Sequence, residues 1–430
     1  NALGLANEWV SPMFEAPTGN ATLDLLMRRP PSLIDDGFLI PVSGDDYLPA
    51  VINAVERMHR TVLAIQGPPG SGKTYLGSRT IAHLVEQGKK IAVVANSHSA
   101  VENLLSGCIE AGVSGNAIAK QPKKEDRTPR SWTTPSGYSV MKNWRARQTS
   151  GYVIGGTAWT FCSSFILQEE FDYIFIDEAA QFSLVDAIAV GGGSTNIVLL
   201  GDPMQLTQVV QAVHPGGVDN SALGHYMGDQ QILDQEHGYF VEVTRRMHPK
   251  VNAPVSWLSY QNRLHSHQDA HSQQIPGLSP GFQLHPVRHI GNSSHSAEEV
   301  EAVLALTKKY LELVGQDQVL IVAPYNAQVD AIRNALDEVN LTEVQVGTVD
   351  KFQGREAQIV IISLAASTSD DAPRGLEFLL DRNRLNVALS RAKTNSYLVF
   401  CPDLIRTRFN NVEDVKAISR LAGLLNFADA

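Results

Sequence analysis

The sequence predicts an α/β protein with two tandem cores, each a parallel β-sheet covered by helices. Three observations support this fold class: two successive series of short apolar runs rich in β-branched residues, helical stretches between the runs, and a length of 430 residues. Near-continuous apolar runs indicate strands that are buried on both faces, as in parallel sheets. A chain of this length is long enough for two or three domains.

Five apolar runs make up each series. The first series contains TVLAIQ, KIAVVA, GYVIGG, FDYIFID and NIVLLGD, and the second contains YFVEV, VLIVAPY, VQVGTVD, QIVIIS and SYLVF. We therefore place the two cores at residues 40–235 and 236–430. Residues 1–39 are rich in proline, so we expect a linker or the remnant of an upstream domain there. We expect residues 262–296, which are rich in His, Ser, Gln and Pro, to be irregular.

The composition is ordinary for a globular protein, with 43% hydrophobic and 19% charged residues. The chain has no run of 18 apolar residues, and it begins without a signal-peptide pattern or a Met, so we expect a piece of a cytoplasmic protein. The net charge of −10 disfavours a protein that coats nucleic acid and requires any binding groove to be local. Three widely spaced cysteines indicate neither a zinc site nor a disulfide framework.

The stretch GPPGSGKTY at residues 67–75 contains the pattern of a phosphate-binding loop. It follows the run TVLAIQ and opens a helical stretch that ends near Gly88, and this context favours a phosphate loop over a simple glycine-rich turn. Glycines let backbone N–H groups surround phosphates at a helix N-terminus. Lys73 is expected to contact the β- and γ-phosphates, and Thr74 to bind Mg²⁺. The predicted nucleotide contacts are Gly67, Pro68, Pro69, Gly70, Ser71, Gly72, Lys73, Thr74 and Tyr75.

Two adjacent carboxylates lie at the end of a predicted buried strand: Asp177 is the last residue of FDYIFID, and Glu178 is the first residue of EAAQ, which follows. Asp177 is expected to hold Mg²⁺, and Glu178 to orient and deprotonate the attacking water, whereas the alternative is a solvated strand end. Gln205 in NIVLLGDPMQL can form a hydrogen bond with a γ-phosphate or its water. ATP and Mg²⁺ are therefore the predicted cofactors.

Arginines in the second series complete the expected chemistry. TRRMHP contains Arg245 and Arg246, and LNVALSRAKT contains Arg391. A positioned arginine accelerates phosphoryl transfer by roughly 10³–10⁵-fold because charge spreads over the departing group. The alternative for each is a surface cation. We expect ATP to lie between the cores, so that closure couples hydrolysis to domain movement.

Residues 119–151 hold eight Lys or Arg against two acids, with tryptophans interleaved. We expect this basic segment to hold a single strand, with phosphates on the cations and bases stacked on Trp132 and Trp144. The alternative is a solvated loop. His265, His267 and His271 lie close together, but they have no Cys or acid partner of clear spacing, so we favour a loop over a metal site. The expected phosphate contacts are Lys120, Lys123, Lys124, Arg127 and Arg130.

Six motifs occur in an order that resembles superfamily 1 helicases, in the branch that includes senataxin and the nonsense-mediated-decay helicase. They are GPPGSGKT, DEAAQ, GDPMQL, RRMHP, VGTVDKFQGRE and LNVALSRAK. The resemblance covers about residues 40–405 and implies two RecA-like cores, with residues 119–151 as a subdomain inserted in the first. Three further phrases resemble the helicase half of bacterial proteins that carry a RecB-like nuclease upstream: HPGGVDNSALGH, APYNAQ and DAPRGLEFLLDRNRLN.

The resemblance implies roles for individual residues. Asp177 matches the Mg²⁺ acid, Glu178 the catalytic base and Gln205 the γ-phosphate sensor. The other implied nucleotide contacts are the γ-phosphate arginines Arg246 and Arg391, and Gly354 and Glu356, which match a motif that contacts ribose and phosphates. The implied contacts with the strand are Ser97, Thr157, Pro324, Tyr325 and Thr348.

Two departures from the family's pattern concern the base of the nucleotide. The stretch DDYLPAVINAVERM lacks the glutamine with which many relatives read adenine. Arg245 stands where relatives often have an aromatic residue that stacks on the base, and its guanidinium plane can stack instead.

These features predict an ATP-driven translocase or helicase on single-stranded nucleic acid. The resemblance favours DNA, 5′→3′ movement and a nuclease domain in the same full-length chain. Three alternatives stay open: a nucleotide-switched clamp that gates a nuclease or partner without unwinding, an RNA helicase, and a P-loop ATPase unrelated to nucleic acid.

Overall fold

The computed structural model describes residues 18–35, 37–123, 126, 128–163, 171–208, 217, 219–406 and 411–428. In this part of the chain no helix is long and apolar enough to cross a membrane. The chain divides into two compact units. The first comprises residues up to 68, 72–203 and 207–241, and the second comprises 69–71, 204–206 and the residues from 242 onward.

The first unit is built on a seven-stranded sheet with the strand order β3-β4-β2-β5-β6-β1-β7, in which every pairing is parallel. The carboxyl ends of parallel strands meet at one edge of the sheet, where ligands of such folds bind. The strands are β1 (Val62–Gln66), β2 (Lys90–Val94), β3 (Ile118–Lys120), β4 (Tyr152–Gly156), β5 (Phe171–Ile176), β6 (Ser194–Gly201) and β7 (Gly238–Phe240).

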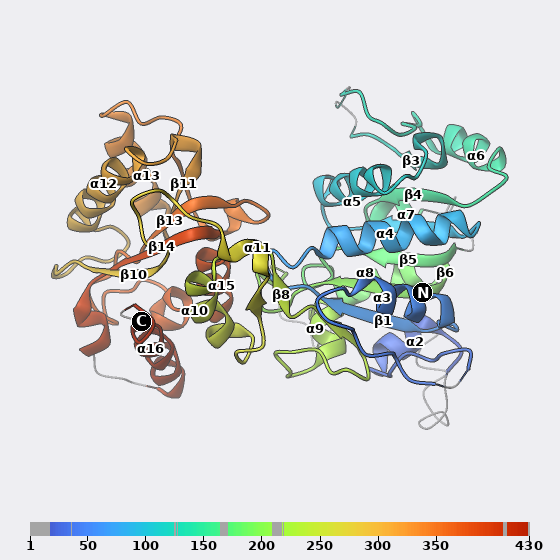
Figure 1. Cartoon of the computed structure of the whole chain (residues 1–430), viewed down its shortest axis with the longest axis horizontal. Helices are drawn as coiled ribbons and strands as arrows, with labels where there is room; N and C mark the ends of the chain where they lie inside the picture. The colour runs from blue at the N-terminus through green and yellow to red at the C-terminus, as the bar shows by residue number, and fades with distance from the viewer. Residues whose placement is uncertain are drawn as a thin grey trace. The chain divides into compact units, whose positions relative to one another are not determined.

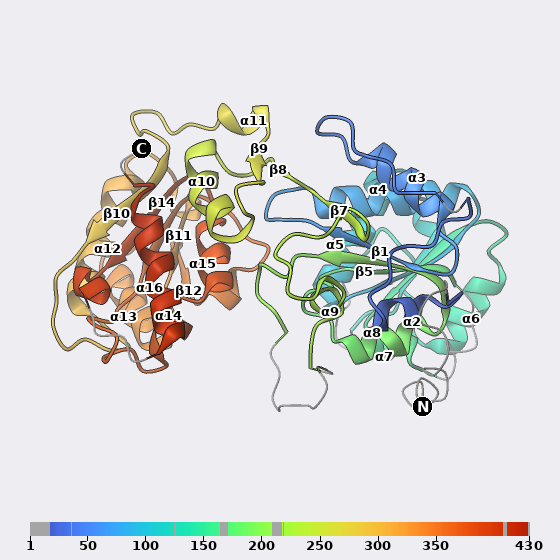
Figure 2. The ribbon, with the colours of Figure 1, turned by 90° about the horizontal axis from the view of Figure 1, so that it is seen from below.

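Helices cover both faces of this sheet. Figure 2 shows α3 (Leu48–Arg57) and α4 (Lys73–Glu86) on one side, and α2 (Ala21–Leu26) and α8 (Leu184–Gly191) on the other. Helix α4 ends as the sequence predicts, because Gly88 follows it with a positive φ of 81°. The remaining helices of the unit are α5 (His98–Glu110), α6 (Tyr138–Ala146), α7 (Ala158–Phe161) and α9 (Ala222–Met227).

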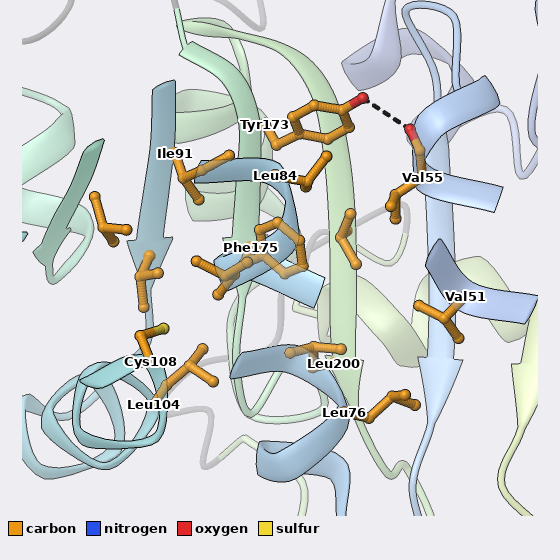
Figure 3. Packing of buried hydrophobic residues seen from close by; sticks show 14 of the residues in the cluster. Val51, Val55, Leu76, Leu84, Ile91, Leu104, Cys108, Tyr173, Phe175 and Leu200 are labelled. Carbon is orange, nitrogen blue, oxygen red and sulfur yellow. Dashed lines mark hydrogen bonds between the residues drawn. The ribbon is translucent and has the colours of Figure 1, made fainter. Parts of the chain in front are cut away.

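A hydrophobic core fills the space between the sheet and helices α3, α4 and α5 (Figure 3). Val55 of α3, Leu84 of α4 and Phe175 of β5 are fully buried in it. Burial of each such side chain stabilises the fold by about 1.5–3 kcal/mol. The hydroxyl of Tyr173 donates a hydrogen bond to the carbonyl oxygen of Val55 at 2.7 Å, so the one polar atom of that ring is satisfied.

The N-terminal part that the structure describes belongs to the first unit, which corrects our expectation of a linker. Asn20 caps α2 by accepting from the backbone N–H groups of Thr22 and Leu23. Asp24 is fully buried and accepts from the hydroxyls of Thr18 at 2.6 Å and Thr61 at 2.9 Å. Helix α2 also packs against α8 and α9. Tertiary contacts therefore fix this segment, although its local composition is typical of a linker.

The second unit contains a five-stranded parallel sheet with the order β10-β14-β13-β11-β12. Figure 1 shows α12 (Ala297–Leu311) and α13 (Asn326–Asp337) on one side, and α10 (Pro249–Ser259), α15 (Arg382–Leu389) and α16 (Val412–Leu425) on the other. The strands are β10 (Gly281–Pro286), β11 (Val319–Val322), β12 (Gln345–Gly347), β13 (Ala357–Ser363) and β14 (Ala392–Phe400). The predicted α/β class with two parallel sheets is confirmed.

Several strands differ from the sequence prediction. YFVEV was expected to open the second core, but Gly238–Phe240 forms β7, which pairs with β1 in the first sheet. Val243, the last residue of this run, forms β8 (Val243–Thr244) together with Thr244, in a small two-stranded sheet with β9 (His265–Ser266). Strand β10 lies inside the stretch 262–296 that we expected to be irregular, where polar residues interrupt the apolar pattern of an edge strand.

A buried polar network in the second unit fixes the turn that follows β13. Glu299, in the first turn of α12, is fully buried and accepts from the Ser363 hydroxyl at 2.6 Å and from the Ala365 N–H at 3.0 Å. Its other carboxylate oxygen lies 3.0 Å from Nε2 of His289. The side-chain amide of Gln328 donates to the Ser363 hydroxyl at 2.9 Å. Because Gln328 lies in the first turn of α13, the network also fixes the start of that helix.

Candidate nucleotide and strand sites

The phosphate loop lies between β1 and α4, as the sequence predicts. Gly70 and Gly72 have positive φ values of 73° and 80°, a region that glycine enters without steric penalty. The N–H of Gly67 donates to the carbonyl oxygen of Gly201 at 2.8 Å, which attaches the start of the loop to the end of β6. The loop thus has the left-handed backbone turns and the following helix that a phosphate site requires.

Lys73 is the first residue of α4, and its ammonium lies 3.3 Å from a carboxylate oxygen of Glu178. Burial by itself would lower the pKa of Lys73, but the charges of Glu178, Asp177 and Asp202 outweigh it and raise the pKa above its ordinary value. The lysine is therefore held protonated among carboxylates. Phosphate oxygens of a bound nucleotide would offer it the same charge.

Asp177 and Glu178 follow β5 directly. Burial raises the pKa of the Asp177 carboxyl to about 6; the charge of Lys73 offsets part of this rise, and the charge of Glu178 adds to it. Glu178 has a φ of 52°, an uncommon conformation for a residue with a side chain, and its N–H donates to an Asp177 carboxylate oxygen at 2.9 Å. Strained backbone of this kind clusters at functional sites.

Asp202 is a third carboxylate at this edge, buried like Asp177, and the sequence reasoning missed it. It follows β6, is 1% exposed, and accepts from the side-chain amide of Gln66 at 3.3 Å. Gln66 is the last residue of β1 and is itself held by Leu233, whose N–H donates to the Gln66 side-chain oxygen at 2.8 Å. The signal was present in GDPMQ, where an acid follows a buried strand as in DEAAQ.

The donor set fits Mg²⁺. This ion usually takes one or two carboxylates and completes its shell with waters and substrate phosphates. The carboxylate of Asp177 and the hydroxyl of Thr74, the second residue of α4, provide such a partial shell. Among the residues with described positions, no cluster of three or more His, Cys, Asp or Glu could hold a metal ion by itself.

The second unit brings together four residues that the sequence links to the γ-phosphate and ribose. Arg246 donates to a carboxylate oxygen of Glu356 at 2.7 Å and to the carbonyl oxygen of Ser390 at 3.1 Å. Arg391 is 2% exposed and donates to the side-chain oxygen of Gln205 at 3.4 Å. Gln205 lies in the segment 204–206, which belongs to the second unit.

Glu356 holds two cations in the second unit. Burial would raise the pKa of its carboxyl, but the hydrogen bond from Lys393 and the charge of Arg246 lower it below its ordinary value. Gly354, two residues earlier, has a φ of 77°. Arg245 is exposed, and its guanidinium lies 3.1 Å from Nδ1 of His267. His267 is the capping residue of a short helix, Gln268–His271.

The expected strand contacts lie at the carboxyl edges of the two sheets. In the first unit, Ser97 follows β2 and Thr157 follows β4, and these strands pair with Val94 opposite Gly156. The Ser97 hydroxyl also caps α5 by accepting from the Ala100 N–H at 3.1 Å.

In the second unit, Pro324 and Tyr325 follow β11 and Thr348 follows β12, and Val322 pairs with Gly347. Each unit therefore collects its own expected contacts on one edge of its sheet.

The basic segment 119–151 differs from its expected role. Trp132 is 8% exposed and belongs to the hydrophobic core, so its ring is not available to stack on a base. Lys120 is 1% exposed and donates to a carboxylate oxygen of Glu102 at 2.8 Å, so it is not available to a phosphate. The indole N–H of Trp144 donates to the carbonyl oxygen of Asn116 at 3.1 Å.

The other phosphate contacts that we expected in the segment are only partly available. Arg130 pairs with Glu102 at 2.9 Å and with Asp126 at 2.7 Å. Lys123 is exposed and keeps its expected role as a possible phosphate contact. Lys124 and Arg127 lie outside the described residues.

The chain is similar to several known proteins and to two family models. Residues 49–237 and residues 219–402 match two family models that are each described as an AAA domain. The DNA replication ATP-dependent helicase/nuclease dna2 of Schizosaccharomyces pombe is 28% identical over 418 residues, which cover 86% of this chain and 29% of that protein. The Probable helicase MAGATAMA 3 of Arabidopsis thaliana is 27% identical, covering 85% of this chain and 46% of that protein.

A third relative, the Regulator of nonsense transcripts 1 of Dictyostelium discoideum, is 26% identical and covers 80% of this chain and 30% of that protein. The chain thus spans less than half the length of each of these three relatives. Both the order of the motifs and these similarities support an ATP-driven helicase of superfamily 1: the chain is similar to Dna2-type helicase/nucleases and to a regulator of nonsense transcripts.

Proposed function

We propose that this chain hydrolyses ATP with Mg²⁺ and uses the energy to move along a single strand of nucleic acid and unwind duplexes. The observation that supports it most is the carboxylate pair at the end of β5, whose Glu178 lies 3.3 Å from the phosphate-loop lysine, Lys73. A phosphate-binding cation and a carboxylate base within reach of each other are the elements that water attack on a γ-phosphate requires.

The pairing of Lys73 with Glu178 suggests how the base becomes available. When phosphate oxygens lie beside Lys73, its ammonium turns to them and releases the Glu178 carboxylate. That carboxylate then accepts the proton of the attacking water. Asp177 and Thr74 would hold Mg²⁺, which neutralises charge on the phosphates when bound. Arg246, Arg391 and Gln205 are the proposed contacts for the departing phosphate.

We favour DNA as the strand because the motif resemblance points to nuclease–helicase fusions and because the S. pombe relative is named for DNA replication. By analogy with the branch, movement is 5′→3′ and a nuclease domain lies in the same full-length chain. The relative named as a regulator of nonsense transcripts supports RNA as the second candidate.

The test compares ATPase rates with single-stranded DNA, with single-stranded RNA and without nucleic acid, and then measures unwinding of duplexes with a 5′ or a 3′ overhang. We expect stimulation by DNA and unwinding from the 5′ overhang. The control is Glu178→Gln, which should bind ATP but lose most turnover in single-turnover kinetics. An ATPase rate that nucleic acid leaves unchanged would contradict the proposal, and stimulation without unwinding would support the clamp.

A further inference from the structure

Two arginines in the second unit share one aromatic ring. The guanidinium carbon of Arg374 lies 3.7 Å from the centre of the Phe378 ring, and that of Arg384 lies 4.5 Å from it. The Tyr325 ring is next to Phe378, with 5.8 Å between the ring centres. We call these four residues the arginine–aromatic cluster. The sequence analysis assigned a role to Tyr325 but none to the other three.

Acids balance only part of the positive charge of the cluster. Arg384 pairs with Asp350 at 3.5 Å, and the Asp350 side chain is half exposed. Within the described part of the chain, Arg374 forms no ion pair and its contact is with the Phe378 ring. Two guanidinium groups on one ring repel each other, although each is attracted by the ring. An anion that both groups can reach would remove this repulsion.

The hydroxyl of Tyr325 also lacks a partner. Tyr325 is 8% exposed, and among the residues with described positions its buried hydroxyl has no hydrogen-bond partner. Burial raises the pKa of this hydroxyl, and the positive charge of Arg374 partly opposes the rise. Buried hydroxyls are normally satisfied, so this one indicates a place for an acceptor that is not part of the chain.

The cluster lies where a ligand of a parallel sheet is expected. Tyr325 follows β11 and caps α13, and Asp350 follows the neighbouring strand β12. Phe378 belongs to α14 (Gly375–Leu379), and Arg384 lies on α15. The carboxyl edge of the sheet therefore carries the cluster together with the expected strand contact Thr348. The Glu299 network fixes the start of α13 and with it the position of Tyr325.

We propose that Arg374, Arg384 and the Tyr325 hydroxyl form a phosphate-binding site, with the Phe378 ring as its floor, that takes one backbone phosphate of the bound strand. Guanidinium groups match the oxygens of a phosphate in geometry and charge. The phosphate also accepts a hydrogen bond from the Tyr325 hydroxyl. The Phe378 ring holds both guanidinium groups in place by its contact with them. The inference deepens the proposed function, on which its strand-binding part rests.

The first test is fluorescence anisotropy of a labelled oligo(dT) at several salt concentrations. Arg374→Ala and Arg384→Ala should each weaken binding and flatten the log–log salt slope by at most about 0.7, and the double variant should flatten it by about 0.7 in total, the value for one phosphate contact on a single strand. Tyr325→Phe should weaken binding without changing the slope, because it removes a hydroxyl and no charge. Its thermal midpoint should not fall, since the hydroxyl has no partner within the described structure.

The matched control is Lys309→Ala. Lys309 also lies over an aromatic ring, with its ammonium 5.2 Å from the centre of the Tyr310 ring. It lies ten residues along α12 from Glu299, which corresponds to about 15 Å along the helix axis and away from the cluster's edge. This variant should keep the slope and the affinity of the unaltered protein. Unchanged slopes in Arg374→Ala and Arg384→Ala, with wild-type affinity in Tyr325→Phe, would overturn the proposal.

A second measurement separates this site from the proposed function. If the unaltered protein binds no strand, the proposed function fails, and inorganic phosphate becomes the probe. Phosphate should then raise the thermal midpoint of the unaltered protein and of Lys309→Ala more than that of an Arg374→Ala/Arg384→Ala double variant. An equal rise in all three would exclude the site. If the unaltered protein binds the strand with a normal salt slope and the double variant does the same, only the site is excluded.

Discussion

The basic segment 119–151 of the first unit and the arginine–aromatic cluster of the second both combine cations with aromatic rings. In the basic segment, Trp132 lies in the core and the buried Lys120 pairs with an acid from another helix. In the cluster, Arg374 and Arg384 lie on an aromatic ring at the carboxyl edge of a sheet. In the segment, Lys120 and Arg130 pair with Glu102, whereas in the cluster Arg374 forms no ion pair among the described residues.

The difference shows that the availability of a cation depends on its surroundings and not on the number of its basic neighbours. Glu102 of α5 lies outside the basic segment, but it pairs with both Lys120 and Arg130. No local count of charges includes this acid. The cluster, in contrast, depends on three residues within a span of eleven, and on Tyr325, which reaches it through the fold.

Among the variants that distinguish the two regions, we expect Trp132→Ala to have the largest effect, which is a loss of stability. Because this ring is buried in the core, its loss should lower the free energy of unfolding of the first unit by about 3–5 kcal/mol. Chemical denaturation followed by circular dichroism measures it. The control is Trp159→Ala, since Trp159 is 87% exposed and its loss should change stability by at most about 0.5 kcal/mol. If Trp132→Ala weakened strand binding and left stability unchanged, Trp132 would stack on a base of the strand after all.

Lys120→Met should have the next largest effect. Removing the buried ammonium should lower the free energy of unfolding by about 1–3 kcal/mol, because Glu102 keeps only Arg130 as a partner. Burial, followed by the charges of Lys120 and Lys123, lowers the pKa of His98, so the variant should raise that pKa in an NMR titration. A salt slope flattened by about 0.7, with no loss of stability, would instead make Lys120 a phosphate contact.

Nucleotide binding with Mg²⁺ at Asp177 and strand binding at the arginine–aromatic cluster should depend differently on pH. The Asp177 carboxyl has its pKa raised to about 6, so between about pH 4 and 6 the folded state holds this proton more firmly than the unfolded state. Stability from this group therefore falls as the pH rises through that window. Mg²⁺ requires the ionised carboxylate, so Mg²⁺-dependent nucleotide affinity should increase about tenfold per pH unit below 6 and level off above it.

Strand binding at the arginine–aromatic cluster should stay flat over the same range, since guanidinium groups remain charged. Titration calorimetry with nucleotide and Mg²⁺, and anisotropy with oligo(dT), measure the two profiles. Asp177→Asn should abolish the step near pH 6. A step of the same size in strand binding would mean that a titrating group, and not the cluster, dominates the contact with the strand.

The smallest effect is expected for Lys123→Ala. Lys123 is the exposed residue among the described phosphate contacts that we expected in the basic segment, so its loss should flatten the salt slope by at most about 0.7. We expect a smaller change than for Arg374→Ala, because a solvated lysine on a loop loses side-chain freedom when it binds. If Lys123→Ala had the larger effect, the basic segment would be the principal strand contact and the comparison would be reversed.

The sequence predicted the parts of the molecule whose signals are local. Strands β1 and β5 are buried along almost their whole length and read as continuous apolar runs, and the phosphate loop has a fixed pattern. Strands β3 and β10 lie at sheet edges, and β10 carries partly exposed polar residues. Neither strand forms a long apolar run, so the sequence did not predict them. The burial of Trp132 and the Glu299 network depend on contacts between distant segments, which no local pattern records.

The way the chain leaves the first unit has a mechanical consequence. Strand β7 lies beside β1, and the N–H of Val241, the last residue of the unit, donates to the carbonyl oxygen of Gln66 at 2.9 Å. A pull on residue 242 along the strand direction loads the bonds between β7 and β1 in shear, so they resist together and do not open one by one. Because β1 continues directly into Gly67, the force on β1 is transmitted to the phosphate loop through the backbone.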